Sequence, residues 1–212
     1  MINVVIADDH PLVREGLKKV VDQTTIDIKV IGEASDAGEL LELLREKDPD
    51  IVILDIAMPG KSGLDVLKDI KEYHPGLPVL ILSMHPEDRF AIRSLKAGAS
   101  GYLTKSSISE QMVSAIRKIV VEKKRFISPA VAEQLADRVD VNSNKPLHEE
   151  LSDREYQIMC MIGSGKKVNE IAEELSISKQ TVHTYRSRIK DKMKLKSNVE
   201  ITRYALKHSL ID

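Results

Sequence analysis

The 212-residue sequence is poor in aromatic residues and in cysteine. It contains no Trp, five Tyr and two Phe, and its single Cys excludes a framework of intramolecular disulfides. No apolar run approaches the roughly 18 residues of a membrane-spanning helix, and the N-terminus lacks the basic region of a signal peptide. These absences predict a cytoplasmic protein without a membrane segment. In contrast, 42% hydrophobic and 31% charged residues suit a folded core and exclude a disordered chain.

The charge of the chain is close to zero in total but unevenly distributed. The formal net charge is −1. Residues 1–150 carry 20 Lys and Arg against 25 Asp and Glu, a net charge of −5, whereas residues 151–212 carry 12 against 8, a net charge of +4. An acidic front and a basic rear indicate two domains with different partners.

Short apolar runs alternate with amphipathic stretches of helical length through the first 123 residues. The runs are rich in Val and Ile and are continuous, which is typical of strands buried on both faces; they lie at 3–7, 29–33, 51–54, 79–82 and 101–103. The helical stretches lie near 11–23, 37–47, 63–74, 88–97 and 108–123. Five strand–helix repeats predict a doubly wound α/β domain with a five-stranded parallel sheet.

From about residue 127 the alternation stops, and a polar, turn-rich stretch at 142–146 reads as a linker. A short helix could run from Ser128 through Val139 before it. We expect a first domain at 1–124, a linker at 125–148 and a second domain at 149–212.

The second domain is predicted to be all helical and small. Two capping boxes, which pair Ser152 with Glu155 and Ser197 with Glu200, mark the start of its first and last helices. Between them, residues 168–193 follow the pattern helix, three-residue turn, helix, which is typical of a helix-turn-helix.

Acidic side chains follow the first and third predicted strands. Asp8 and Asp9 end the first strand and Asp55 the third, and the carboxyl ends of parallel strands form the ligand-binding edge of such a sheet. Neighbouring carboxylates repel one another unless a cation lies between them, and Mg²⁺ prefers a few carboxylates plus water. Ser83 and Lys105 reach the same edge, so the set suits a phosphoryl group with Asp55 as its nucleophile.

With Met58-Pro59, Gly63 and Tyr102 added, these residues resemble the receiver domain of bacterial two-component response regulators over roughly residues 1–123. The resemblance implies that Asp55 accepts phosphate from a sensor histidine kinase and that Lys105 pairs with the phosphate. It implies a Mg²⁺ site formed by Asp8, Asp9, Asp55 and the carbonyl of Ala57. It also implies a switch pair, in which the Ser83 hydroxyl follows the phosphate and the ring of Tyr102 turns inward.

The residues of this first domain also allow three alternatives. A hydrolase of the haloacid dehalogenase type also uses a strand-end Asp, but it normally has a second Asp where this sequence has Ala57. We therefore expect a protein that is not an enzyme. Tyr102 could simply pack at a strand edge. His10 is more typical of a helix start than of a metal ligand, because no second His or Cys stands at ligand spacing.

The second helix of the predicted helix-turn-helix is strongly basic. Residues 179–196 hold seven Lys or Arg and one Asp, a net charge of +6, which favours binding to DNA phosphates. Val182, Tyr185, Ile189 and Met193 share one face and are expected to pack inward. The residues expected to contact DNA are Ser178, Lys179, Thr181, His183, Thr184, Arg186, Ser187, Arg188 and Lys190.

The tail resembles the LuxR-type helix-turn-helix, in segments 151–155, 170–172, 175–178, 181–182 and 192–195. Joined to a receiver, it resembles a NarL/FixJ-type transcriptional regulator. This implies that phosphorylation shifts homodimerisation and binding to double-stranded promoter DNA. Departures at Val168, His183, Tyr185 and Asn198 leave the base preference unpredicted. The alternative is a protein-interaction hub of a phosphorelay, whose tail binds a partner protein or RNA.

Overall fold

A computed structural model describes residues 1–58, 61–84, 87–129, 131–133 and 146–211. The chain forms two compact units, Met1–Val141 and Asn142–Asp212. Within the part of the chain that the structure describes, no helix is long and apolar enough to cross a bilayer.

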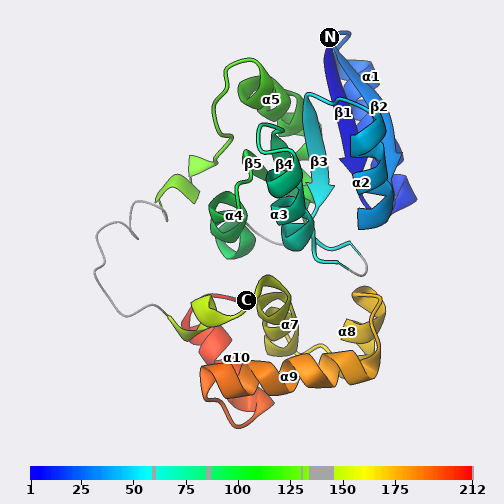
Figure 1. Cartoon of the computed structure of the whole chain (residues 1–212). Coiled ribbons are helices and arrows are strands. Elements are labelled where there is room, and N and C mark those ends of the chain that lie inside the picture. Colours follow the sequence, from blue (N-terminus) through cyan, green and yellow to red (C-terminus); the bar gives the residue numbers. More distant parts are fainter. Residues whose placement is uncertain (59–60, 85–86, 130, 134–145, 212) are drawn as a thin grey trace. The chain divides into compact units, whose positions relative to one another are not determined.

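The N-terminal unit is a five-stranded parallel sheet with a helix after each strand (Figure 1). Its strands are β1 (Ile2–Ala7), β2 (Ile28–Ala34), β3 (Ile51–Asp55), β4 (Val79–Ser83) and β5 (Gly101–Thr104). Its helices are α1 (Pro11–Thr24), α2 (Ala37–Glu46), α3 (Gly63–Tyr73), α4 (Glu87–Lys96) and α5 (Ile108–Val120), with a 3-10 turn η1 (Lys105–Ser107) before α5. The strand order is β2-β1-β3-β4-β5. The predicted doubly wound α/β fold is confirmed.

Both faces of this sheet are buried, which explains why its strands are continuous apolar runs. Val4 and Ile6 of β1 pack with Leu17 of α1 and Ile116 of α5 in one hydrophobic cluster. Val5 is equally buried, and the alternation of side chains along a strand places it on the opposite face. The helices α2 and α3 lie in front of the sheet in the view of Figure 1.

The order of the strands brings the predicted acidic residues together. The chain winds outward in both directions from the neighbouring strands β1 and β3. Ala7 of β1 lies opposite Leu54 of β3, so the residues that follow them, Asp8 and Asp55, leave the sheet side by side. At the other side of β3, Asp55 lies opposite Leu82, one residue before Ser83.

The chain returns to the sheet after α5. The backbone N–H of Phe126 donates to the carbonyl of Ser100 at 2.9 Å, and Phe126 forms a parallel bridge with Gly101 at the edge strand β5. A Cβ on Gly101 would lie 3.0 Å from Cβ and from the carbonyl oxygen of Phe126, so the close approach favours glycine. Residues 131–133 are helical, whereas the rest of the helix predicted through 139 and most of the polar stretch at 142–146 lie outside the described residues.

The C-terminal unit is all helical. It comprises η2 (Leu147–Glu150), α7 (Asp153–Gly163), α8 (Val168–Glu174), α9 (Lys179–Met193) and α10 (Asn198–Lys207). The helix α7 packs against α9 and α10, and α8 packs against α9. The centre of the unit is formed by Ile158, Ile171, Ile189 and Ile201, one from each helix, and all four are fully buried. A helix-turn-helix formed by α8 and α9 is confirmed.

The two predicted capping boxes differ in the structure. At α7 the box is complete, because Ser152 caps the Glu155 N–H and Glu155 accepts from the Ser152 N–H at 2.8 Å. At α10, Ser197 accepts from the Glu200 N–H, but the Glu200 carboxylate accepts from the Lys196 N–H at 2.7 Å. The prediction of the second capping box is therefore wrong for the Glu200 side chain, because its carboxylate reaches one residue beyond the N-cap residue Ser197.

Candidate functional site

The carboxyl ends of β1 and β3 form a buried acidic edge. Asp8 is fully buried and Asp55 is 1% exposed, while Asp9 is half-buried. One potential ligand atom from each of Asp8, Asp9, His10 and Asp55 lies within 4.8 Å of all the others. The structure thus brings together the three carboxylates that the sequence placed at this edge.

Lys105 reaches this edge from the end of β5. Its Nζ lies 2.6 Å from Oδ2 of Asp8 and donates to Oδ2 of Asp55 at 3.0 Å. The lysine side chain is only 7% exposed, so the contact is sheltered from water. Thr104 pairs with Ser83 across β4 and β5, and this register delivers the residue after Thr104 to the acidic edge.

The protonation properties of the site follow from two carboxylates sharing one ammonium. Burial raises the pKa of Asp55, and the nearby Asp8 raises it further, although the Lys105 charge opposes both effects. Burial would lower the pKa of Lys105, but Asp55 and Asp8 together raise it. The lysine is therefore held charged, and its one ammonium serves two buried carboxylates.

The loop after β3 is fixed against Asp55. The N–H of Ala57 donates to Oδ1 of Asp55 at 3.2 Å, which leaves Oδ2 for Lys105. The N–H of Gly63 donates to the carbonyl of Ile56, and a Cβ on Gly63 would lie 2.4 Å from the carbonyl oxygen of Asp55. Glycine at position 63 is thus required by the close approach of α3 to this loop, which gives a physical reason for the motif residue.

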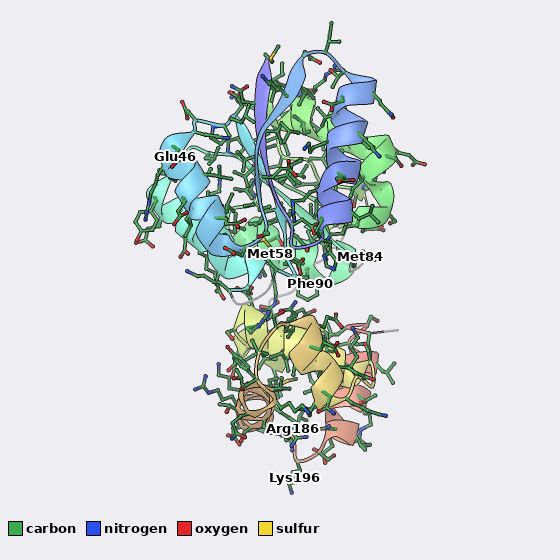
Figure 2. All side chains as sticks on the ribbon, turned by 90° about the vertical axis from the view of Figure 1, so that its right-hand side faces the viewer. Glu46, Met58, Met84, Phe90, Arg186 and Lys196 are labelled. Carbon is green, nitrogen blue, oxygen red and sulfur yellow. The ribbon has the colours of Figure 1, made fainter. Side chains whose placement is uncertain are left out.

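The predicted switch residues are both buried. Ser83 ends β4 with no exposed surface, and Tyr102 of β5 is 2% exposed, with Ile81 opposite it. The ring of Tyr102 therefore lies inside the unit in this structure. Met58 and Phe90 lie at the same end of the N-terminal unit (Figure 2) and are also buried.

His10 and Arg14 support the acidic edge from α1. His10 is the N-cap residue of α1, as expected of a helix start, but its Nδ1 also lies 2.8 Å from Oδ1 of Asp9. Arg14 donates to the backbone carbonyl of Asp8 at 2.6 Å and so fixes the chain where it leaves β1. No sequence pattern indicates this role of Arg14, because the contact depends on the turn between β1 and α1.

The basic helix α9 exposes most of the residues predicted to contact DNA. The exposed ones are Ser178, Lys179, His183, Thr184, Ser187 and Arg188, whereas Thr181, Arg186 and Lys190 are half-buried. Val182, Ile189 and Met193 are buried, as predicted. Tyr185 is only half-buried, so its predicted inward packing is wrong in degree, because it lies at the border of the buried face.

The hydroxyl groups near the start of α9 are already engaged within the helix. Ser178 accepts from the Thr181 N–H at 3.0 Å, and the two hydroxyls are 2.8 Å apart. Thr184 donates to the carbonyl of Gln180 at 3.0 Å. These contacts cap and brace the helix, so they reduce what the three hydroxyls can offer to another molecule.

Two residues of α7, Arg154 and Glu155, make contacts that position the helix-turn-helix. The sequence did not predict these contacts. Arg154 is 5% exposed, and it donates to Oε1 of Gln157 and to the carbonyl of Leu175 at the end of α8. Glu155 accepts from Nζ of Lys192 on α9 at 2.6 Å. Only the pairing of Glu155 with Ser152 was visible in the sequence, because the Leu175 carbonyl and Lys192 lie more than 20 residues from their partners on α7.

A doubly wound domain with an acidic, lysine-bridged edge, joined to a unit with a basic helix-turn-helix, defines a two-domain regulatory protein. Known families match both parts: the response regulator receiver domain matches residues 4–117, and the luxR family of bacterial regulatory proteins matches residues 149–205. The chain belongs to the two-component response regulators of the NarL/FixJ type.

Individual relatives cover nearly the whole chain. The response regulator UvrY of Escherichia coli strain K12 is 37% identical over 99% of this chain and 96% of its own length. The response regulator GacA of Pseudomonas aeruginosa is 38% identical over 100% of this chain and 99% of its own. Among solved structures, RcsB of Salmonella enterica serovar Typhimurium, bound to a promoter in the presence of the phosphomimetic BeF3−, is 26% identical. The similarity extends over 96% of this chain and 97% of the RcsB chain, with a TM-score of 0.60.

Proposed function

We propose that this protein is a transcriptional regulator that a sensor histidine kinase phosphorylates on Asp55. The observation that carries the proposal is the single ammonium of Lys105 shared between the buried carboxylates of Asp8 and Asp55. A carboxylate oxygen of Asp55 would attack phosphorus, and the bond between phosphorus and the donor group would break, leaving an acyl phosphate. Lys105 would then pair with a phosphoryl oxygen.

The acidic edge fits a Mg²⁺ ion. Asp8, Asp9 and Asp55 supply the hard oxygen ligands that this ion prefers, and their ligand atoms lie close to one another. One ammonium does not neutralise this group of carboxylates. The ion would screen the charge of the transferred phosphoryl group, and the carbonyl of Ala57 would complete its protein ligands.

The signal would leave the site through Ser83 and Tyr102. The Ser83 hydroxyl would move toward the phosphoryl group and hydrogen-bond it. Tyr102 is already buried, and its ring would keep the inward position that the movement of Ser83 favours. Phosphorylation would thereby shift the protein toward a homodimer. We assign residues 1–124 to the receiver, 125–148 to the linker and 149–212 to the DNA-binding domain, in a cytoplasmic protein.

The basic helix α9 would enter the major groove of double-stranded promoter DNA. Ser178, Lys179, Thr181, His183, Thr184, Arg186, Ser187, Arg188 and Lys190 are the residues proposed to contact it. A homodimer would place two such helices about one turn of DNA apart. The solved structures of RcsB bound to a promoter and of RcsB dimers bound to DNA support duplex DNA as the partner and a dimer as the binding form.

Phosphotransfer from acetyl phosphate tests the receiver assignment. We expect the wild-type chain to gain one acid-labile phosphate in the presence of Mg²⁺, measured by mass spectrometry, and Asp55→Asn to gain none. Asp65→Asn is the matched control, because Asp65 is 41% exposed on α3 and pairs with Lys68 at the surface. Phosphorylation of Asp55→Asn at the wild-type level would show that the phosphate goes elsewhere.

Mobility-shift titrations test the DNA assignment against the alternative of a phosphorelay hub that binds protein or RNA. The full chain should bind double-stranded genomic fragments more tightly than single-stranded RNA of equal length. Replacing both Lys179 and Lys190 by Ala should weaken binding to every duplex and lower the salt slope by about 1 for each lost phosphate contact. Unchanged binding of this variant would exclude α9 as the contact surface.

A further inference from the structure

Arg186 and His183 form a hydrogen-bonded pair on α9. A terminal nitrogen of the Arg186 guanidinium lies 3.0 Å from Nδ1 of His183. A guanidinium has only donors, so Nδ1 must be the acceptor in this contact. A neutral imidazole carries its single proton on the other nitrogen when Nδ1 accepts, and the His183 ring therefore presents an Nε2–H donor.

The pair lies in the middle of a stripe of basic side chains along α9. Lys179, His183, Arg186 and Lys190 follow one another at spacings of three or four residues and so share one side of the helix. His183 is exposed, whereas Arg186 is half-buried beside the inward-facing Val182. Arg186 makes no ion pair within the described residues, and Figure 2 shows its side chain in the C-terminal unit. The guanidinium is thus held by the imidazole rather than by an acid.

The groups of the pair that their mutual hydrogen bond leaves for another molecule are all hydrogen-bond donors. They are the Nε2–H of His183 and the remaining N–H groups of Arg186. In the major groove guanine presents two adjacent acceptors, N7 and O6. Adenine presents an acceptor beside a donor, thymine an acceptor beside a methyl group, and cytosine a donor. A surface that offers only donors therefore matches guanine and leaves an unfavourable donor–donor contact with adenine and cytosine.

We propose that His183 and Arg186 act as one specificity-determining unit that reads a guanine in each half-site. This inference rests on the proposed DNA-binding function and names the base that the recognition helix selects. The hydrogen bond fixes the imidazole tautomer and orients the guanidinium, so each side chain needs the other to present two donors together. Loss of either residue is equivalent to loss of both at this base position.

Selection from duplexes with randomised bases tests the unit. The full chain should select a guanine at one position of each half-site, and His183→Ala, Arg186→Ala and the double variant should each reduce the preference there about tenfold. The double variant should lose no more than either single variant. Affinity for an unrelated duplex should fall far less than affinity for the selected one. Arg203→Ala is the matched control, since Arg203 is exposed on α10, outside the residues proposed to contact DNA, and should leave the base preference unchanged.

Substitution of 7-deazaguanine at the selected position provides a second measurement, because it removes the N7 acceptor. It should weaken binding of the wild-type chain but not weaken His183→Ala further. The proposal is overturned if both single variants lose affinity equally for all sequences, which would make them phosphate contacts, or if their effects simply add. Failure of the wild-type chain to bind any duplex would instead overturn the DNA-binding function itself.

Discussion

Nζ of Lys105 donates to Oδ2 of Asp55 at 3.0 Å, across fifty residues of sequence and between two nearly buried side chains. The same ammonium also serves Asp8. Because the site contains fewer positive than negative charges, its stability depends on every cation that reaches it.

Lys105→Met should destabilise the N-terminal unit. Removal of the ammonium leaves two buried carboxylates without a counter-charge, which costs about 3 kcal/mol of unfolding free energy. Added Mg²⁺ should stabilise this variant more than the wild type. Removal of the Mg²⁺ with a chelator should reverse this increase in stability. Urea denaturation followed by circular dichroism measures both effects.

Lys124→Met is the control for that substitution. Its ammonium pairs with Glu122 at 3.2 Å, but it is 69% exposed, and exposed pairs contribute less than about 1 kcal/mol. If the two variants had equal stability, the buried pairing of Lys105 would have no net effect on folding.

Gly63→Ala should disturb the loop that carries Asp55. The added Cβ would lie 2.4 Å from the carbonyl oxygen of Asp55 and 2.6 Å from Cα of Ile56, and backbone cannot move aside cheaply. We expect a loss of about 2 kcal/mol in unfolding free energy and slower phosphorylation by acetyl phosphate.

The matched substitution, Gly16→Ala, should have the opposite sign. Gly16 is exposed within α1 and no atom lies within 4 Å of the added Cβ. Alanine in a helix interior is roughly 0.5 to 1 kcal/mol better than glycine. Thermal denaturation of both variants would contradict the steric explanation if Gly63→Ala proved as stable as Gly16→Ala.

Acid should loosen the C-terminal unit through Glu155. Burial alone would raise the pKa of this carboxyl, but hydrogen bonds from Lys192 and Ser152 lower it below its ordinary value of 4.5. The folded state therefore binds this proton less readily than the unfolded state, so the stabilisation is present above pH 4.5 and is lost as the pH falls below it.

Hydrogen exchange of the α7 and α9 amides as a function of pH measures this effect. Glu155→Gln should exchange faster than the wild type near neutral pH, and the difference should shrink as the solution is acidified below pH 4.5. A difference that stayed constant with pH would assign the effect to packing rather than to charge.

Arg154→Met should weaken the link between α7 and the turn after α8. The substitution keeps much of the apolar volume but removes the donors to Gln157 and to the Leu175 carbonyl. Hydrogen bonds of a charged donor contribute about 2 kcal/mol each, so the C-terminal unit should unfold at lower urea and bind DNA less tightly. Arg203→Met, on an exposed position of α10, should change neither property.

The sequence predicted local features well because local rules determine them. Each strand of the sheet was found within two residues of its ends, since Val- and Ile-rich runs and the intervening polar turns mark them. The acidic edge was predicted because the carboxyl ends of parallel strands form one edge of the sheet, and the observed strand order then brings Asp8 beside Asp55.

The features that could not be predicted depend on distances between remote segments. Nothing near Lys192 or Glu155 in sequence indicates that they meet. The packing of α9 against its neighbouring helices determines that Tyr185 is only half-buried. The length of the Glu200 side chain determines that its carboxylate accepts from the Lys196 N–H. The imidazole tautomer of His183 likewise depends on one rotamer of Arg186.

The bridge between Phe126 and Gly101 has a practical consequence for dissecting the protein. The family match to the receiver ends at residue 117, yet the Phe126 N–H still donates to the Ser100 carbonyl, and Phe126 bridges Gly101 at the start of the edge strand β5. A fragment cut directly after α5 would expose an unpaired strand edge, which promotes self-association. A receiver fragment that extends past Phe126 should stay monomeric at concentrations where the shorter one aggregates.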